Sequence, residues 1–118
     1  MISKANEYRR EIIQNMKGGV GQFEIDHLVE KQYLEGAGSL FARGTLAPGH
    51  SVGWHVHADT VEICYVLSGS GIAVEDDGTR HDISVGDTQV CRSGCGHEII
   101  NNGDEPLSYL AVVLYAKG

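Results

Sequence analysis

The sequence predicts an all-β protein, and three observations carry that prediction. Short segments with alternating apolar and polar residues recur along the chain. Sixteen glycines separate these segments, about twice the average usage of roughly 7%. No segment sustains the 3.6-residue periodicity of an amphipathic helix. About nine or ten short strands joined by glycine-containing turns are typical of a sandwich or a barrel.

The expected elements follow one another in a simple order. Residues 8–13 form either a strand or one helical turn, and the glycine-rich run 17–21 forms a flexible turn, since no Lys-Ser/Thr pair follows it as in a phosphate loop. Strand 22–30 alternates, with Phe23 and Ile25 on one side, and residues 33–38 form a turn. Further strands are expected at 39–46, 52–57, 62–67, 72–75, 79–83, 88–91, 97–101 and 107–114. The pair Asp77-Gly78 predicts a hairpin, because both residues tolerate the positive φ angles of a primed turn.

Length, charge and cysteine content limit the class of protein. The 118 residues suffice for one domain with a hydrophobic core. A net charge of −7 argues against nucleic acid as a partner, because such binding needs clustered lysine and arginine. No apolar run approaches the roughly 20 residues that span a membrane, and the polar start is unlike an export signal. Three cysteines, an odd number, argue against a disulfide framework, so a cytoplasmic location is expected.

Two histidines at alternate positions of one strand predict a metal site. His55 and His57 project from the same face, because strand side chains alternate with a period of two. Glu62 follows after a short loop, and His97 comes from a distant segment. Three imidazole nitrogens and one carboxylate oxygen form a donor set that divalent transition metals accept. A pair of surface histidines on an edge strand is the simplest competing interpretation, but it leaves the spacing of Glu62 and His97 unexplained.

Two spaced motifs resemble those of the cupin family. The first runs Gly49, five residues, His55-Val56-His57, four residues, Glu62, six residues, Gly69. The second runs Gly86, five residues, Arg92, one residue, Gly94, two residues, His97, three residues, Asn101. The family usually has a proline where this chain has Arg92; that proline stiffens a loop and binds no metal.

The resemblance implies a jelly-roll β-barrel of about six to eight strands. Residues 39–118 would form the barrel, and residues 1–38 an N-terminal arm of strands that contributes to the sheet or to a dimer. The resemblance further implies one divalent transition metal per chain inside the barrel, held by His55, His57, Glu62 and His97. The metal is Fe, Mn, Ni, Co, Zn or Cu, since such sites follow availability as much as affinity. A barrel that keeps these residues without binding metal is the alternative.

The direction of the ligands predicts the direction of their neighbours. If His55 and His57 face inward, Trp54 and Val56 face outward. An inward Glu62 turns Cys64 and Val66 inward as well. On the later strand His97, Ile99 and Asn101 share a face, which gives a site that is polar at one end and apolar beyond.

Two functions remain open at this point. The first is a mononuclear metalloenzyme acting on a small organic substrate as a dioxygenase, isomerase, decarboxylase or lyase, with Glu62 as a ligand and a movable base. The second is non-catalytic binding or sensing of a small metabolite in the barrel. A homodimer is expected in either case, because strands such as 22–30 can pair with the sheet edge of a neighbour.

Other polar and aromatic residues have simpler expected roles. Solvated surface is the expected place of His27, His50 and His81. Cys64, Cys91 and Cys95 are expected to be buried small residues, with Cys95 the one that could compete as a soft ligand. Arg92 either holds an anionic substrate or is solvated. The isolated aromatic residues, which either stack on a planar ligand or belong to the core or a dimer interface, are Phe41, Trp54, Tyr65 and Tyr109.

Overall fold

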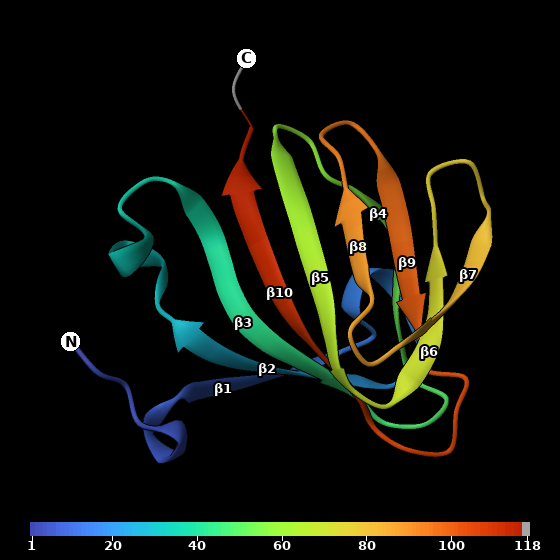
Figure 1. Ribbon diagram of the computed structural model, residues 1–118, viewed down its shortest axis with the longest axis horizontal. Coiled ribbons are helices and arrows are strands. Elements are labelled where there is room, and N and C mark those ends of the chain that lie inside the picture. Colours follow the sequence, from blue (N-terminus) through green and yellow to red (C-terminus); the bar gives the residue numbers. More distant parts are fainter. Residues whose placement is uncertain (117–118) are drawn as a thin grey trace.

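The computed structural model describes residues 1–116, whose regular structure is almost entirely β-strand (Figure 1). The ten strands in this range are β1 (Arg9–Gln14), β2 (Gln22–Val29), β3 (Gly38–Leu46), β4 (Ser51–Val56), β5 (Thr60–Ser68), β6 (Ser70–Val74), β7 (Arg80–Ser84), β8 (Thr88–Cys91), β9 (Gly96–Ile100) and β10 (Leu107–Tyr115). The helical elements in the same range are three short 3-10 turns: η1 (Ala5–Glu7), η2 (Met16–Gly18) and η3 (Lys31–Leu34). None of the helices in residues 1–116 has the length and apolar character needed to cross a bilayer. The all-β prediction is confirmed.

The strands form two antiparallel sheets. One has six strands in the order β1-β2-β3-β10-β5-β8, and the other has four in the order β4-β9-β6-β7 (Figure 1). Strands far apart in the sequence are neighbours, such as β3 with β10 and β4 with β9, as a jelly roll requires. Among the described residues no strand pairing joins the two sheets, so the predicted barrel is a pair of sheets and not a closed cylinder.

The N-terminal strands extend the six-stranded sheet beyond β3. Residues 9–14 pair with residues 22–27, so the segment that sequence left open between strand and helical turn is a strand. β2 pairs with β1 on one side and β3 on the other. The strand expected to meet a neighbouring molecule is therefore already paired twice within the chain, and β1 is the outer strand of the sheet.

A buried carboxylate links these three strands. Asp26 of β2 is only 5% exposed. Its Oδ1 accepts a hydrogen bond of 2.7 Å from Arg10 Nε of β1, and its Oδ2 accepts one of 2.9 Å from Arg43 Nη2 of β3. The hydrogen bond from Arg10, aided by Arg43, outweighs the effect of burial and lowers the pKa of Asp26. The charge of Asp26 thus stabilises the N-terminal part of the sheet.

The core follows the alternation of the strands. On β10 the buried residues are Leu107, Tyr109, Ala111 and Val113. The ring of Tyr109 stacks on that of Phe23, with centroids 6.0 Å apart. Cys64 and Val66 of β5 are buried, as the inward direction of Glu62 predicts. The core therefore fills the interior next to the predicted ligands.

Candidate metal centre and its cavity

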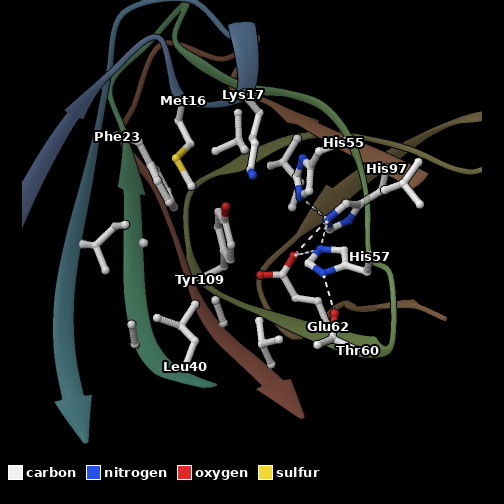
Figure 2. A pocket seen from close by; sticks show the side chains of 18 of the residues that line it. Met16, Lys17, Phe23, Leu40, His55, His57, Thr60, Glu62, His97 and Tyr109 are labelled. Atoms are coloured by element: carbon white, nitrogen blue, oxygen red, sulfur yellow. Dashed lines mark hydrogen bonds and ion pairs between the residues drawn. The ribbon is translucent and has the colours of Figure 1, made fainter. Parts of the chain in front are cut away.

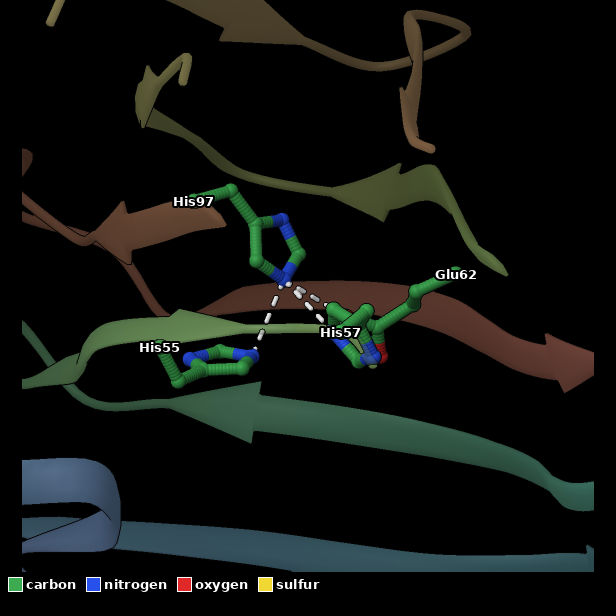
Figure 3. Close-up of side chains that lie close together, drawn as sticks. All are labelled: His55, His57, Glu62 and His97. Atoms are coloured by element: carbon green, nitrogen blue, oxygen red, sulfur yellow. Dashed lines mark hydrogen bonds and ion pairs between the residues drawn. The ribbon is translucent and has the colours of Figure 1, made fainter. Parts of the chain in front are cut away.

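Four side chains from two sheets converge in the interior (Figure 3). His55 lies on β4 opposite His97 of β9, and His57 directly follows β4. Glu62 lies on β5 of the six-stranded sheet. One ligand atom from each residue lies within 4.8 Å of all the others. The structure thus brings together all four residues that the sequence predicts as metal ligands.

The distances between these atoms match the size of a coordination shell. His97 Nε2 lies 3.0 Å from His55 Nε2 and 3.2 Å from His57 Nε2. Glu62 Oε1 lies 2.8 Å from His97 Nε2 and 3.2 Å from His57 Nε2. Donors about 3 Å apart are neighbours around an ion whose bonds are about 2.1 Å long. The four residues therefore fit a single transition-metal ion.

The outer nitrogen of each imidazole ring has a partner of its own. His55 Nδ1 lies 2.7 Å from the Gly53 carbonyl oxygen, and His57 Nδ1 lies 3.2 Å from Thr60 Oγ1. His97 Nδ1 lies 2.9 Å from Gln89 Oε1. A neutral ring that donates its Nδ1–H to such an oxygen has a free lone pair on Nε2. Such lone pairs on the three rings would point at a common centre, where a metal ion could accept them.

The pKa shifts of His55 and Glu62 favour the unprotonated forms that a metal ion needs. Burial lowers the pKa of His55, and the hydrogen bond to the Gly53 carbonyl only partly opposes this effect. Burial by itself would raise the pKa of Glu62, but hydrogen bonding to His57 and His97 outweighs it and brings the pKa to about 2. The carboxylate is therefore ionised at neutral pH and available as an oxygen ligand.

A cavity of about 390 Å³ adjoins the four ligands (Figure 2). Its apolar wall includes Phe23, Leu40 and Ile99, and its polar side chains outside the ligand set are Lys17, Thr60 and Tyr109. Burial raises the pKa of Tyr109, so its hydroxyl keeps its proton. The volume falls in the range of small-molecule sites, with the predicted polar end and apolar remainder.

Several residues of the site lie outside the sequence-based prediction. Gln89 and Thr60 orient two of the ligands, and Lys17 lines the cavity from the glycine-rich run that sequence assigns to a flexible turn. Gln89 lies on β8, eight residues before His97, and its contact depends on how β8 faces β9. No sequence pattern marks such a relationship between strands of different sheets.

Arg92 and Cys95 do not reach the cavity. Neither is among the described residues that line it, and Arg92 is exposed. The loop that lacks the usual proline is instead fixed by backbone hydrogen bonds, from Gly94 N to His57 O at 2.7 Å and from His57 N to Cys95 O at 3.0 Å. The loop therefore holds His57 in place through its backbone.

The remaining cysteines are buried as predicted. Burial raises the pKa of Cys64 well above its ordinary value and that of Cys91 to about 11. Both are therefore neutral thiols at physiological pH, and neither belongs to the cluster of four ligands.

The prediction for one of the other histidines is wrong. His27 is not solvated: its side chain is only 11% exposed and its ring contacts Glu11 across the β1–β2 pair. His50 is half-buried and accepts a hydrogen bond of 3.0 Å from Gln22 N away from the cavity, and His81 is exposed as predicted.

The isolated aromatic residues divide between core and surface. Tyr109 lines the cavity as part of the core, whereas Trp54 and Tyr65 are 44% and 42% exposed. Trp54 packs over Gly96 on the outer side of the four-stranded sheet, and Val56 is also exposed. The predicted outward direction of Trp54 is confirmed, whereas Val56 is exposed and also lines the cavity.

Comparison with known proteins agrees with this architecture. The cupin domain family matches residues 42–113, well over half of the chain. This protein is a cupin. It is 40% identical over 114 residues to an oxalate-binding protein of Thermotoga maritima, an alignment covering 97% of this cupin and 93% of that relative.

Solved structures show the same cupin fold. The crystal structure of a predicted oxalate decarboxylase from Thermotoga maritima superposes with a TM-score of 0.93 at 39% identity, covering 98% of this cupin and 99% of that chain. A polyketide cyclase from Streptomyces resistomycificus has a TM-score of 0.74 at 20% identity, with 99% and 81% covered. The second likeness concerns the fold alone.

Proposed function

We propose that this cupin binds one divalent transition metal through His55, His57, Glu62 and His97, and uses it to bind a small carboxylate of the oxalate type. The convergence of three imidazole Nε2 atoms and one ionised carboxylate at the end of a cavity carries this proposal. A bound ion would supply a Lewis acid for two neighbouring oxygens of the ligand. The protein's own residues supply the four donors and the cavity.

Oxalate is the appropriate probe for two reasons. A relative with 40% identity over nearly the whole chain is an oxalate-binding protein. Four protein ligands also leave two positions in the six-coordinate shell of an ion such as Mn²⁺ or Fe²⁺, which suit a ligand with two adjacent oxygens. We therefore propose chelation as the mode of ligand binding.

The side chains of the cavity favour binding over turnover. Loss of carbon dioxide from a carboxylate leaves a carbon that has to receive a proton. Glu62 is the only carboxyl group among the described lining residues, and it is committed to the ligand set. Tyr109 has a hydroxyl in the cavity, but its raised pKa makes it a poor acid, and Lys17 is exposed at the mouth of the cavity. Binding is thus the function that the geometry supports best.

Titration of oxalate into metal-free and Mn²⁺-loaded protein tests the proposal. We expect binding by calorimetry only in the loaded form, and no release of carbon dioxide or formate on incubation. Equal binding with and without metal would contradict metal-dependent chelation. Steady release of carbon dioxide from the loaded protein would instead assign the cupin to the decarboxylases.

We also propose a homodimer built on the outer face of the six-stranded sheet. Phe41, Val112, Ile63 and Val90 lie side by side on four neighbouring strands, because the register pairs each with the next. Val90, at the end of this row, is 49% exposed. A second copy of the chain would bury this apolar row.

A further inference from the structure

A cationic side chain enters the cavity from outside the ligand set. Lys17 belongs to η2, the turn between β1 and β2, and its side chain extends from that turn into the cavity (Figure 2). The residue is exposed overall, which places it at the mouth. Lys17 and Glu62 are the only lining residues in the described chain whose side chains carry a fixed charge.

The turn that carries Lys17 is held directly against β4. A Cβ atom on Gly53 would lie 2.3 Å from the Lys17 carbonyl oxygen, and one on Gly19 would lie 2.2 Å from the Ser51 carbonyl oxygen, so both contacts require glycine. Val20 N donates a hydrogen bond of 2.9 Å to Ser51 Oγ, and Ser51 N donates one of 2.9 Å to Val20 O. The backbone of the turn is therefore fixed beside the strand that carries His55.

Lys17 itself has a left-handed backbone, with φ of 56° and ψ of 31°. This conformation is sterically unfavourable for most L residues. The chain nevertheless has a lysine here, directly before Gly18 and Gly19 and next to the cavity. Gly53 meanwhile orients His55 through its carbonyl oxygen. Gly53 thus contacts both His55 and the turn that carries Lys17.

Charge indicates what this arrangement selects. A divalent ion and Lys17 together carry three positive charges against the single negative charge of Glu62. The cavity therefore favours a ligand with two negative charges, although the chain as a whole has a net charge of −7. One oxygen of each carboxylate would meet the metal, and Lys17 would face the oxygens that point away from it.

We infer that Lys17 determines specificity for dianionic over monoanionic chelating ligands. This inference rests on the proposed function, because the metal has to chelate the ligand. Arg92, which sequence offers as the anion-binding cation, does not line the cavity.

Oxalate and oxamate provide a matched pair of probes, because oxamate replaces one carboxylate by a neutral amide of similar size. Calorimetry would measure the binding of each probe to three Mn²⁺-loaded proteins: the wild type, Lys17→Gln and Lys31→Gln. Lys31 is an exposed lysine of η3 outside the cavity and serves as the control. Metal content of each variant is measured separately.

We expect Lys17→Gln to weaken oxalate binding about tenfold, a loss between those that follow removal of an exposed and of a buried ion pair. Oxamate binding and metal content should be unchanged. Lys31→Gln should match the wild type. An unchanged ratio of oxalate to oxamate affinity in Lys17→Gln would overturn the inference alone. If the loaded wild type binds neither probe, the proposed function fails and the inference with it.

Discussion

His97 Nδ1 and Gln89 Oε1 lie 2.9 Å apart in the most buried part of the site, where His97 is 1% and Gln89 7% exposed. The amide oxygen accepts the ring N–H and so directs the lone pair of His97 Nε2 at the other three ligands. The amide nitrogen of Gln89 has no hydrogen-bond partner among the described residues. Gln89 thus acts as a hydrogen-bond acceptor for His97. This role can be tested by replacing Gln89 while all four predicted ligands are kept.

Replacing this acceptor should weaken metal binding. We expect Gln89→Met, which keeps the side-chain length, to lower metal affinity about tenfold, because His97 loses the partner that fixes its tautomer. Gln89→Glu keeps an acceptor and should retain the affinity. Chelator competition measures both, with Gln32→Met on the exposed η3 turn as the control. Equal affinity of Gln89→Met and wild type would exclude an orienting role.

Removal of one ligand should abolish metal binding. We expect His57→Ala to be purified without stoichiometric metal and to lack the rise in Tm that the wild type shows on metal addition, since the ion binds only the folded form. Elemental analysis and thermal unfolding with and without metal check this. His81→Ala, at an exposed position of β7, should keep both properties. A full complement of metal in His57→Ala would remove His57 from the ligand set.

Metal affinity should fall with acidification. Three imidazole rings have to be neutral to bind, so protons compete with the ion as pH falls, and burial, which lowers the pKa of His55, delays that competition at His55. We expect affinity to fall at least about tenfold between pH 7 and pH 5. Calorimetric titration at several pH values measures it. Constant affinity down to about pH 4.5 is incompatible with a site dominated by histidine.

The Asp26 carboxylate should stabilise the fold in a pH-dependent way. Since Arg10 and Arg43 lower its folded-state pKa, its contribution is complete above the ordinary aspartate pKa and is lost as pH falls through the lowered value. Asp26→Asn should therefore reduce the free energy of unfolding by about 2 kcal/mol at pH 7, and the difference from wild type should shrink below about pH 4. Urea unfolding at both pH values measures it. Asp82→Asn, at an exposed position, should have little effect, and a constant difference at all pH values would contradict the assignment.

A charge in the apolar row should dissociate the proposed dimer. We expect Val90→Lys to be monomeric at concentrations where the wild type is dimeric, because the lysine would be buried against the partner. Sedimentation velocity measures the change. Val85→Lys, at a 63% exposed position in the turn before β8, is the matched control. An unaltered dimer in Val90→Lys would place the interface elsewhere, for example at the outer edge of β1.

Sequence predicts the strands and the common face of His55 and His57 because both depend on local periodicity, whereas the jelly roll and the full ligand set follow from the resemblance to cupins. The alternation around His55 and His57 fixes their common face, and the same alternation fixes Glu62, Cys64 and Val66. Such short-range patterns do not depend on contacts between distant segments, so the predicted order of strands along the chain and the predicted inward residues are correct.

The parts that escape sequence analysis depend on contacts between elements. Gln89 meets His97 only because β8 and β9 face each other across the interior, and Lys17 meets the cavity only because its turn lies against Gly53. His27 becomes buried through its neighbours in the sheet, although its sequence context suggests the surface. Each is a property of packing between segments distant in the sequence.

In the cluster of four, His55 and His97 lie on the four-stranded sheet, His57 directly follows β4 of that sheet, and Glu62 lies on the six-stranded sheet. A coordinated ion would consequently cross-link the sandwich, much as a disulfide joins two segments of backbone. In the proposed function, loss of the ion would therefore free the ligand and remove a link between the two sheets at the same time.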